Sequence, residues 1–205
     1  MTAFLLSVSA FAQNNIHFIP VSFTNYGTET TPKVWSDMCF TTDNSTTYGE
    51  IQKALNQEGN FYIQLFHEQK FWDVPVYIHT EYRAQSSVDV EHILMVGAAF
   101  TLGTENGYIA IEPLCRVDGT KGNWGIVQPM MSVVSGHDWD VFNLNTFTDF
   151  WYDDNSMNNG FNWYSELWSY FNVHKYVELG AVTQFAYSGP GTFFVGISPA
   201  LKIKF

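Results

Sequence analysis

The C-terminal segment, residues 193–205, alternates between two kinds of side chain. Every second position counted back from the terminus is apolar: Phe205, Ile203, Leu201, Pro199, Ile197, Val195 and Phe193. The positions between them are mostly small or charged. Because successive side chains of a β-strand point to opposite faces, this period places all these apolar residues on one face. One face could therefore contact hydrocarbon while the other contacts water.

Four other segments split in the same way, namely 75–84, 90–102, 138–151 and 160–172. In the first of them, Val76, Ile78, Thr80 and Tyr82 alternate with Tyr77, His79, Glu81 and Arg83. In 75–84, the charged side chains and the histidine therefore share one face. The pattern predicts β-strands that each have one polar and one apolar side.

Turn-forming clusters divide the chain into about twelve segments, long enough for tilted strands that cross a bilayer. The predicted strands are 14–24, 33–43, 47–56, 60–70, 75–84, 90–102, 107–117, 122–134, 138–151, 160–172, 175–187 and 192–205. Asn106-Gly107 predicts a two-residue hairpin turn of type I′. Segment 47–56 could instead form a short helix, and the strand count would then fall toward ten.

A soluble β-sandwich also alternates, so composition has to separate it from a membrane barrel. Charged residues make up 14% of the chain and aromatic residues 18%, whereas a soluble domain has about 25% charged residues. The solvent-facing side of a sandwich would need many more charges, and a lipid-facing wall needs none. We therefore expect an all-β fold, a transmembrane antiparallel up-and-down β-barrel of about 12 strands, with 10 as the alternative.

The formal net charge of -11 argues against a nucleic-acid partner, which favours a basic surface. No pattern typical of a zinc, calcium, phosphate or nucleotide site appears, so we expect no metal and no cofactor. Cys39 and Cys115 lack metal-ligand spacing. We expect free thiols, with a disulfide in an oxidising periplasm as the alternative.

The N-terminus has the pattern of the end of an export signal. A short apolar run, residues 4–8, precedes Ala10-Phe11-Ala12, which fits an A-x-A cleavage site. Residues 1–12 are thus interpreted as a residual signal peptide and 13–205 as a single barrel domain. A short buried strand or a helix start is the alternative for this segment.

Three segments resemble bacterial outer-membrane barrels. The C-terminal strand ending at Phe205 looks like the segment that the barrel-assembly machinery reads. Segment 70–82 looks like a hairpin of Tsx-like outer-membrane proteins, and 147–154 looks like a strand that runs into one of their acidic loops. The resemblance extends over most of 60–205, within a branch of short barrels of unassigned function. It implies a twelve-stranded barrel and nucleoside uptake through a narrow channel, and no nucleoside-binding residue can be carried over to this chain.

The candidate pore-lining or solute-binding residues are the polar and aromatic side chains of the expected inward faces: Tyr77, His79, Glu81, Arg83, Glu112, Arg116, Asn145, Asp149, Trp151, Tyr164, Glu166, Trp168 and Glu178. Aromatic rings in a lumen could stack a nucleobase, and carboxylates could bind sugar hydroxyls. Structural filling is the competing interpretation, in which Glu81 pairs with Arg83 and Glu112 with Arg116. The tryptophans expected at the membrane interfaces are Trp35, Trp72, Trp124, Trp139 and Trp163.

These patterns predict a monomeric barrel in the bacterial outer membrane, with a narrow channel for small hydrophilic solutes. Nucleosides are the solutes that the resemblance implies. The expected partners are outer-membrane lipid, the assembly machinery and the solute. One alternative is a plugged, non-conducting structural or surface barrel. A less favoured alternative is a lipid-modifying enzyme, since His79 and Glu81 share a face but no serine in 75–84 accompanies them. We therefore expect a protein that is not an enzyme.

Overall fold

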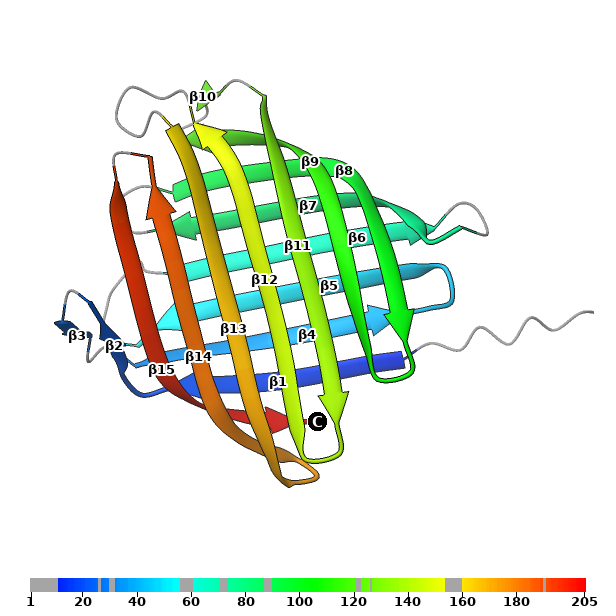
Figure 1. Ribbon diagram of the computed structural model, residues 1–205, viewed down its shortest axis with the longest axis vertical. Coiled ribbons are helices and arrows are strands. Elements are labelled where there is room, and N and C mark those ends of the chain that lie inside the picture. The colour runs from blue at the N-terminus through cyan, green and yellow to red at the C-terminus, as the bar shows by residue number, and fades with distance from the viewer. Residues whose placement is uncertain are drawn as a thin grey trace, which may run out of the picture.

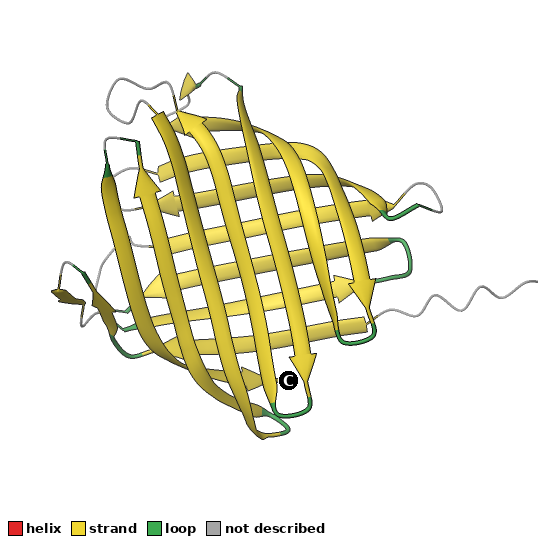
Figure 2. Cartoon of the chain, viewed as in Figure 1, coloured by secondary structure: helices red, strands yellow, loops and turns green. Residues whose placement is uncertain are grey.

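The computed structural model describes residues 11–25, 27–29, 32–55, 61–70, 74–86, 90–120, 123–125, 127–153, 160–189 and 191–205. Twelve long strands of this part form a closed antiparallel barrel (Figures 1 and 2). They are β1 (Phe11–Ile19), β4 (Lys33–Thr41), β5 (Ser45–Ala54), β6 (Phe61–Lys70), β7 (Val76–Ser86), β8 (Val90–Thr104), β9 (Gly107–Thr120), β11 (Gln128–Trp139), β12 (Phe142–Asp153), β13 (Gly160–His174), β14 (Val177–Ser188) and β15 (Thr192–Lys204). Three short strands are β2 (Ser22–Thr24), β3 (Gly27–Glu29) and β10 (Asn123–Trp124). No helix that could cross a membrane occurs among the described residues.

The barrel closes where its first long strand meets its last. Asn15 of β1 lies opposite Lys204 of β15, and Phe18 lies opposite Leu201. The backbone N–H of Phe205 donates to the carbonyl of Asn14 at 3.0 Å. Each other long strand pairs with the long strands next to it in the sequence. Closure removes the open sheet edges, whose unpaired backbone groups are unfavourable in lipid.

The barrel has its apolar side chains outside and its polar side chains inside. Exposed large apolar residues of the outer wall include Met38, Ile51, Leu65, Ile78, Leu94, Val96, Phe100, Ile111, Phe161, Phe171, Leu179 and Ile197. Buried polar residues include Asn15, His17, Asp37, His79, Glu81, Glu112, Ser132, Asn143, Asp149, Asn162, Glu166, Glu178 and Ser198. A soluble protein has the reverse distribution. The apolar exterior requires a hydrocarbon environment, so the barrel spans a membrane.

The connections differ between the two ends of the barrel (Figure 1). The end that carries the connections at 42–44, 71–75, 105–106, 140–141 and 175–176 is named the turn end. The opposite end carries 20–32, 55–60, 87–89, 121–127, 154–159 and 189–191, and is named the loop end. Short turns at one end and longer loops at the other are typical of outer-membrane barrels, where the loops are extracellular.

The strand prediction is confirmed in number, and two of its turns are wrong in position. The β8–β9 turn consists of Glu105 and Asn106, because Thr104 already pairs with Gly107. Strands predicted at 122–134 and 138–151 lie at 128–139 and 142–153. Gly136 therefore lies inside β11, where a Cβ would lie 2.6 Å from the ring of Tyr108. Its role there is to make room for a ring rather than to form a turn.

Three other expectations from the sequence concern segment 47–56, the two cysteines and the N-terminal segment. Segment 47–56 is not helical, since β5 covers most of it, and the ten-strand alternative is wrong. Cys39 on the inner face of β4 and Cys115 on the outer face of β9 are free thiols. Of the predicted signal peptide, residues 1–10 lie outside the described residues, whereas Phe11 and Ala12 belong to β1.

Candidate functional site

All thirteen predicted site residues lie on strand positions whose side chains face the barrel interior. The registers show this as rows of inward-facing neighbours, such as Gln64 opposite Arg83 and Asp149 opposite Tyr164. Most of the thirteen are buried or half-buried, and Asn145 is exposed.

The interior is crossed by an ionic bridge between distant strands. Arg83 of β7 donates from Nη1 to Oδ2 of Asp149 on β12 at 2.8 Å. In the sheet, β8, β9 and β11 separate these two strands, so the bridge spans the lumen rather than neighbouring positions. The Nε of Arg83 also donates to Oε1 of Glu81 at 2.5 Å. The predicted pairing of Glu81 with Arg83 is therefore present.

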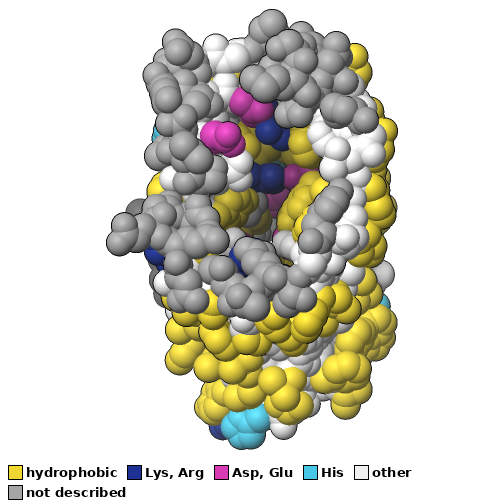
Figure 3. All heavy atoms as spheres, turned by 90° about the vertical axis from the view of Figure 1, so that its left-hand side faces the viewer, with side chains coloured by type: hydrophobic (Ala, Val, Ile, Leu, Met, Phe, Trp, Pro, Cys, Tyr) yellow, Lys and Arg dark blue, Asp and Glu magenta, His cyan; other side chains and the backbone are white. Residues whose placement is uncertain are grey.

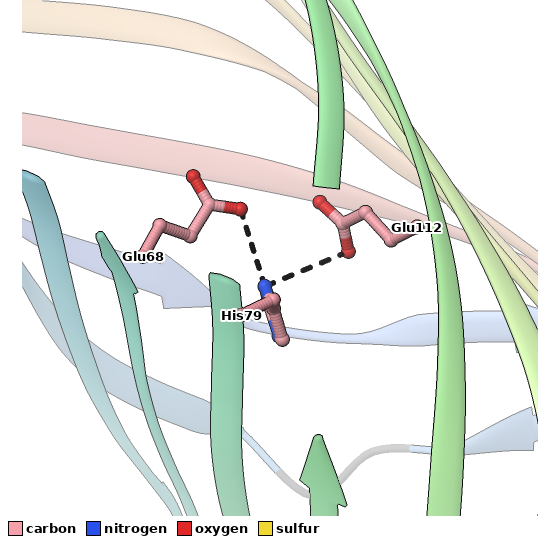
Figure 4. Close-up of side chains that lie close together, drawn as sticks. All are labelled: Glu68, His79 and Glu112. Carbon is pink, nitrogen blue, oxygen red and sulfur yellow. Dashed lines mark hydrogen bonds and ion pairs between the residues drawn. The ribbon is translucent and has the colours of Figure 1, made fainter. Parts of the chain in front are cut away.

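His79 lies next to this bridge, among the carboxylates of Glu68, Glu81 and Glu112. Figure 4 shows Glu68 and Glu112 beside its ring. Its Nε2 is 3.1 Å from Oε2 of Glu81, and its Nδ1 is 3.1 Å from Oε1 of Glu68. Oε2 of Glu112 lies 3.9 Å from the same Nδ1. The predicted pairing of Glu112 with Arg116 is thus wrong. The β8 residue opposite His79 is Gly97, where a Cβ would lie 2.2 Å from the carbonyl oxygen of Pro113, so β9 approaches β8 closely at this point.

An aromatic cluster fills another part of the interior. The ring of His17 stacks on Trp35 at 4.6 Å between centroids, and Trp168 meets both rings edge-on. His17 Nδ1 lies 3.2 Å from the hydroxyl of Tyr170. Trp35 is 1% exposed, so its assignment to the membrane interface is wrong. Trp124 and Trp139 are exposed near the two ends of the barrel, and Trp72 lies outside the described residues.

Two further carboxylates are held by side chains of their own strand and of nearby strands. Glu166 accepts from Nε1 of Trp168 at 2.8 Å and from Nε2 of Gln184 at 2.6 Å. Tyr164 also donates its hydroxyl proton to Glu166. Glu178 is fully buried and accepts from Nζ of Lys204 at 2.7 Å and from Asn143 at 2.5 Å. The side chains of the barrel therefore supply most of the hydrogen-bond partners of these two carboxylates.

A cavity of about 470 Å³ lies inside the barrel at its loop end. Its polar lining includes Arg116 and Asp118, which are joined by two hydrogen bonds of 2.6 and 2.9 Å. Its aromatic lining includes Trp151 and Tyr164, and the guanidinium of Arg116 lies 4.8 Å from the ring centre of Trp151. Figure 3 looks into the hollow mouth of the barrel and shows basic and acidic side chains in it.

Several interior residues were missed by the sequence analysis. They are inward-facing positions of β1, β4, β5 and β6, such as His17, Asp37, Glu50, Gln64 and Glu68. No faces were assigned to these strands. The signal was nevertheless present in β6, where Tyr62, Gln64, Phe66 and Glu68 alternate with Ile63, Leu65 and His67.

No protein-family model and no curated protein sequence matches the chain. Among solved structures, the NanC porin matches with a TM-score of 0.65 at 8% identity, covering 94% of this chain and 100% of the porin. The KdgM porin in complex with disordered oligogalacturonate matches with a TM-score of 0.57 at 8% identity, covering 95% and 99%. An anion-selective porin from Comamonas acidovorans matches with a TM-score of 0.51 at 8% identity, covering 97% and 100%.

These matches show the fold, and the identity is too low to transfer a substrate. The resemblance to Tsx-like proteins stays a prediction, because these three matching structures are porins. With a similar TM-score of 0.51, the chain also matches opdK, an outer membrane protein from Pseudomonas aeruginosa. Together with the apolar exterior and the closed twelve-stranded wall, the matches show a porin-like β-barrel of the bacterial outer membrane.

Proposed function

We propose that this protein is a narrow outer-membrane channel for small hydrophilic solutes that are neutral or positively charged. The observation that carries the proposal is the lining of the loop-end cavity, where aromatic rings and charged groups lie together in a hollow interior. A protein pocket of roughly 300–1,000 Å³ suits a small organic molecule. The cavity is thus large enough to hold a solute of the size of a nucleoside.

The charge of the interior favours cations and neutral molecules over anions. Inward-facing carboxylates outnumber inward-facing Lys and Arg side chains in the described part of the wall. The acidic set is Asp37, Glu50, Glu68, Glu81, Glu91, Glu112, Asp118, Asp138, Asp149, Glu166 and Glu178, and the basic set is Lys33, Lys70, Arg83, Arg116, Lys202 and Lys204. Rings of like charge along a pore repel ions of the same sign. The interior therefore disfavours an acidic saccharide such as the oligogalacturonate named with KdgM.

Nucleosides are the best single substrate class, by the Tsx resemblance and by the cavity lining. Trp151 and Tyr164 offer ring faces to a base, and stacking on an aromatic side chain contributes about 1–3 kcal/mol per base. Asp118 and Asn162 offer oxygen atoms that could accept hydrogen bonds from sugar hydroxyls. Contacts of this strength are weak enough to release the solute on the far side.

A plugged, non-conducting barrel is the second candidate. The Arg83–Asp149 bridge and the cluster of His17, Trp35 and Trp168 occupy interior space away from the cavity. Barrels of about eight strands are filled by their own side chains, and barrels of 16–18 strands leave an aqueous channel, so a twelve-stranded wall falls between the two cases.

Planar-bilayer recording on the refolded protein distinguishes the two candidates. The channel proposal expects discrete conductance steps, a reversal potential that shows cation preference, and a reduced current when a nucleoside is added. The conservative variant Trp151→Leu should weaken the nucleoside block without abolishing the steps. Silence at all voltages would support the plugged barrel. Steps with anion preference would contradict the proposed charge selection.

A further inference from the structure

We propose that Glu68, His79 and Glu112 form a binding site for one divalent transition-metal ion, with Zn²⁺ the best fit. Nδ1 of His79 and one carboxylate oxygen from each glutamate lie within 4.8 Å of one another (Figure 4). The three residues come from β6, β7 and β9, so no spacing motif in the sequence could reveal the site. The inference is independent of the proposed function, since an ion can bind whether or not solutes pass.

The distances fit a metal ion after a small adjustment. Ligand atoms about 2.0–2.2 Å from a tetrahedral Zn²⁺ lie about 3.4 Å from one another. Glu68 Oε1 is 3.1 Å from His79 Nδ1, and Glu112 Oε2 is 3.9 Å from it. Because glutamate side chains are long, rotation of the terminal carboxylates could bring both oxygens to ligand distance. Three protein ligands leave a further coordination position for water, as in open zinc sites.

The partner of the second imidazole nitrogen supports this role for His79. Nε2 lies 3.1 Å from Oε2 of Glu81. When the ring donates its Nε2 proton to this carboxylate, the lone pair of Nδ1 points toward Glu68 and Glu112. Metal-binding histidines commonly donate their other N–H to a carboxylate in this way, which fixes the tautomer and the ring orientation. Glu81 is itself held by Arg83 and Gln64, each at 2.5 Å.

Glu112 provides an independent indication of a missing partner. Its side chain is 7% exposed, and its carboxylate accepts no hydrogen bond from any other described residue; its one ion-pair contact in that part of the chain is His79 at 3.9 Å. A buried carboxylate normally has hydrogen-bond or ionic partners. Glu112 points toward the imidazole at 3.9 Å, beyond hydrogen-bond distance, and a metal ion bound to both groups would supply the partner that its carboxylate lacks.

The excess negative charge of the surroundings favours a divalent ion. Glu68, Glu81, Glu112 and Asp149 gather around His79 and Arg83, so the acidic groups outnumber the two basic ones. The ligand set is mixed, with one imidazole nitrogen and two carboxylate oxygens. Imidazole suits Zn²⁺ and similar transition metals, whereas Ca²⁺ and Mg²⁺ prefer oxygen ligands alone. The geometry therefore points to Zn²⁺ rather than to an alkaline-earth ion.

Metal titration of the refolded, metal-free protein tests the proposal. Zn²⁺ should bind with a stoichiometry of one per barrel in competition with a chromophoric chelator. Co²⁺ should give the visible absorption of an ion bound by four or five ligands. Glu112→Gln keeps the shape of the side chain, so this variant should fold, and it should weaken Zn²⁺ binding at least tenfold. His79→Gln should weaken it further.

His67→Gln is the matched control, because His67 is an exposed histidine on the same strand as Glu68. Its Zn²⁺ affinity should equal that of the wild type. If all variants bind equally, the ion is held adventitiously by the surface and the proposal is overturned. The same conclusion follows if the wild type binds no Zn²⁺ in this titration. Binding of Ca²⁺ or Mg²⁺ as tight as that of Zn²⁺ would overturn the role of the imidazole. Since the assay measures no current, its failure leaves the channel proposal intact.

Discussion

Two arginine–aspartate pairs inside the barrel have similar N···O distances and differ in how far the aspartate is exposed. Arg116 and Asp118 are 2.6 Å apart at the loop-end cavity, and Arg83 and Asp149 are 2.8 Å apart across the lumen. The side chain of Asp118 is 40% exposed, whereas that of Asp149 is 3% exposed. Water can replace the partner of the first pair, but little water can reach the second. We therefore expect the first pair to contribute charge to the mouth of the barrel and the second pair to stabilise the packed interior.

Removal of the Arg83–Asp149 bridge should cause the largest loss of stability. Arg83→Met leaves the carboxylates of Glu81 and Asp149 buried without their cation. Breaking a buried ion pair from one side costs about 3–5 kcal/mol, and we expect a loss of this size in the free energy of unfolding. Denaturant unfolding of the refolded barrel in lipid vesicles, followed by tryptophan fluorescence, measures it. The double variant Arg83→Met/Asp149→Asn should recover part of the loss. A single variant as stable as the wild type would show that the bridge does not brace the barrel.

Truncation of the aromatic cluster of His17, Trp35 and Trp168 should cause the second-largest loss of stability. Trp35→Ala removes a ring that is 1% exposed and that stacks on His17, and such truncations cost about 3 kcal/mol or more. The same unfolding measurement applies, and larger conductance steps would show that the cluster narrows the lumen. Trp35→Phe is the control at the same position. It keeps a ring and removes an indole N–H that has no hydrogen-bond partner among the described residues, so it should cost less than half as much. Equal losses in both variants would contradict this account.

A methyl group added at an inward-facing glycine should lower stability more than one added at an outward-facing glycine. In Gly180→Ala the new methyl group would lie 1.8 Å from the carbonyl oxygen of Ser169 and 2.8 Å from Cα of Tyr170. The backbone must shift, and overpacking of this kind costs about 1–3 kcal/mol. Gly49→Ala on the outer face meets its nearest atom, Cδ1 of Leu65, at 3.7 Å and should be neutral. Heat-induced loss of the compact gel mobility compares the two variants, and equal midpoints would contradict the prediction.

The sequence predicts the strands of this barrel and their faces better than the contacts between side chains in its interior. The period of two assigns each residue of strands such as β7 and β15 to a face without any knowledge of its neighbours. The turns are predicted less well, because a glycine such as Gly136 can serve either a turn or close packing. Only the neighbouring strand decides between the two, and at this position it presents the ring of Tyr108.

Contacts across the lumen could not be predicted from the sequence. Arg83 and Asp149 are 66 residues apart and are not on adjacent strands, so their contact depends on the width and tilt of the closed barrel. The same holds for Glu112, which was expected beside Arg116 and lies beside His79. Arg116 and Glu112 share a face of one strand, but a nearer carboxylate, Asp118, pairs with Arg116.

The smallest effect on stability, and the sharpest test of the contrast between the two pairs, is expected for Arg116→Gln. The carboxylate left behind, Asp118, is 40% exposed, and ion pairs that water can reach contribute about 0–1 kcal/mol, so the free energy of unfolding should change by less than about 1 kcal/mol. The variant removes one positive charge from the cavity and leaves Asp118 partly exposed to solvent. If solutes pass through the cavity, the reversal potential under a salt gradient should shift toward stronger cation preference. Asp118→Asn is the matched control and should shift it the other way. A large loss of stability in Arg116→Gln would instead mean that the mouth pair braces the barrel as Arg83 does.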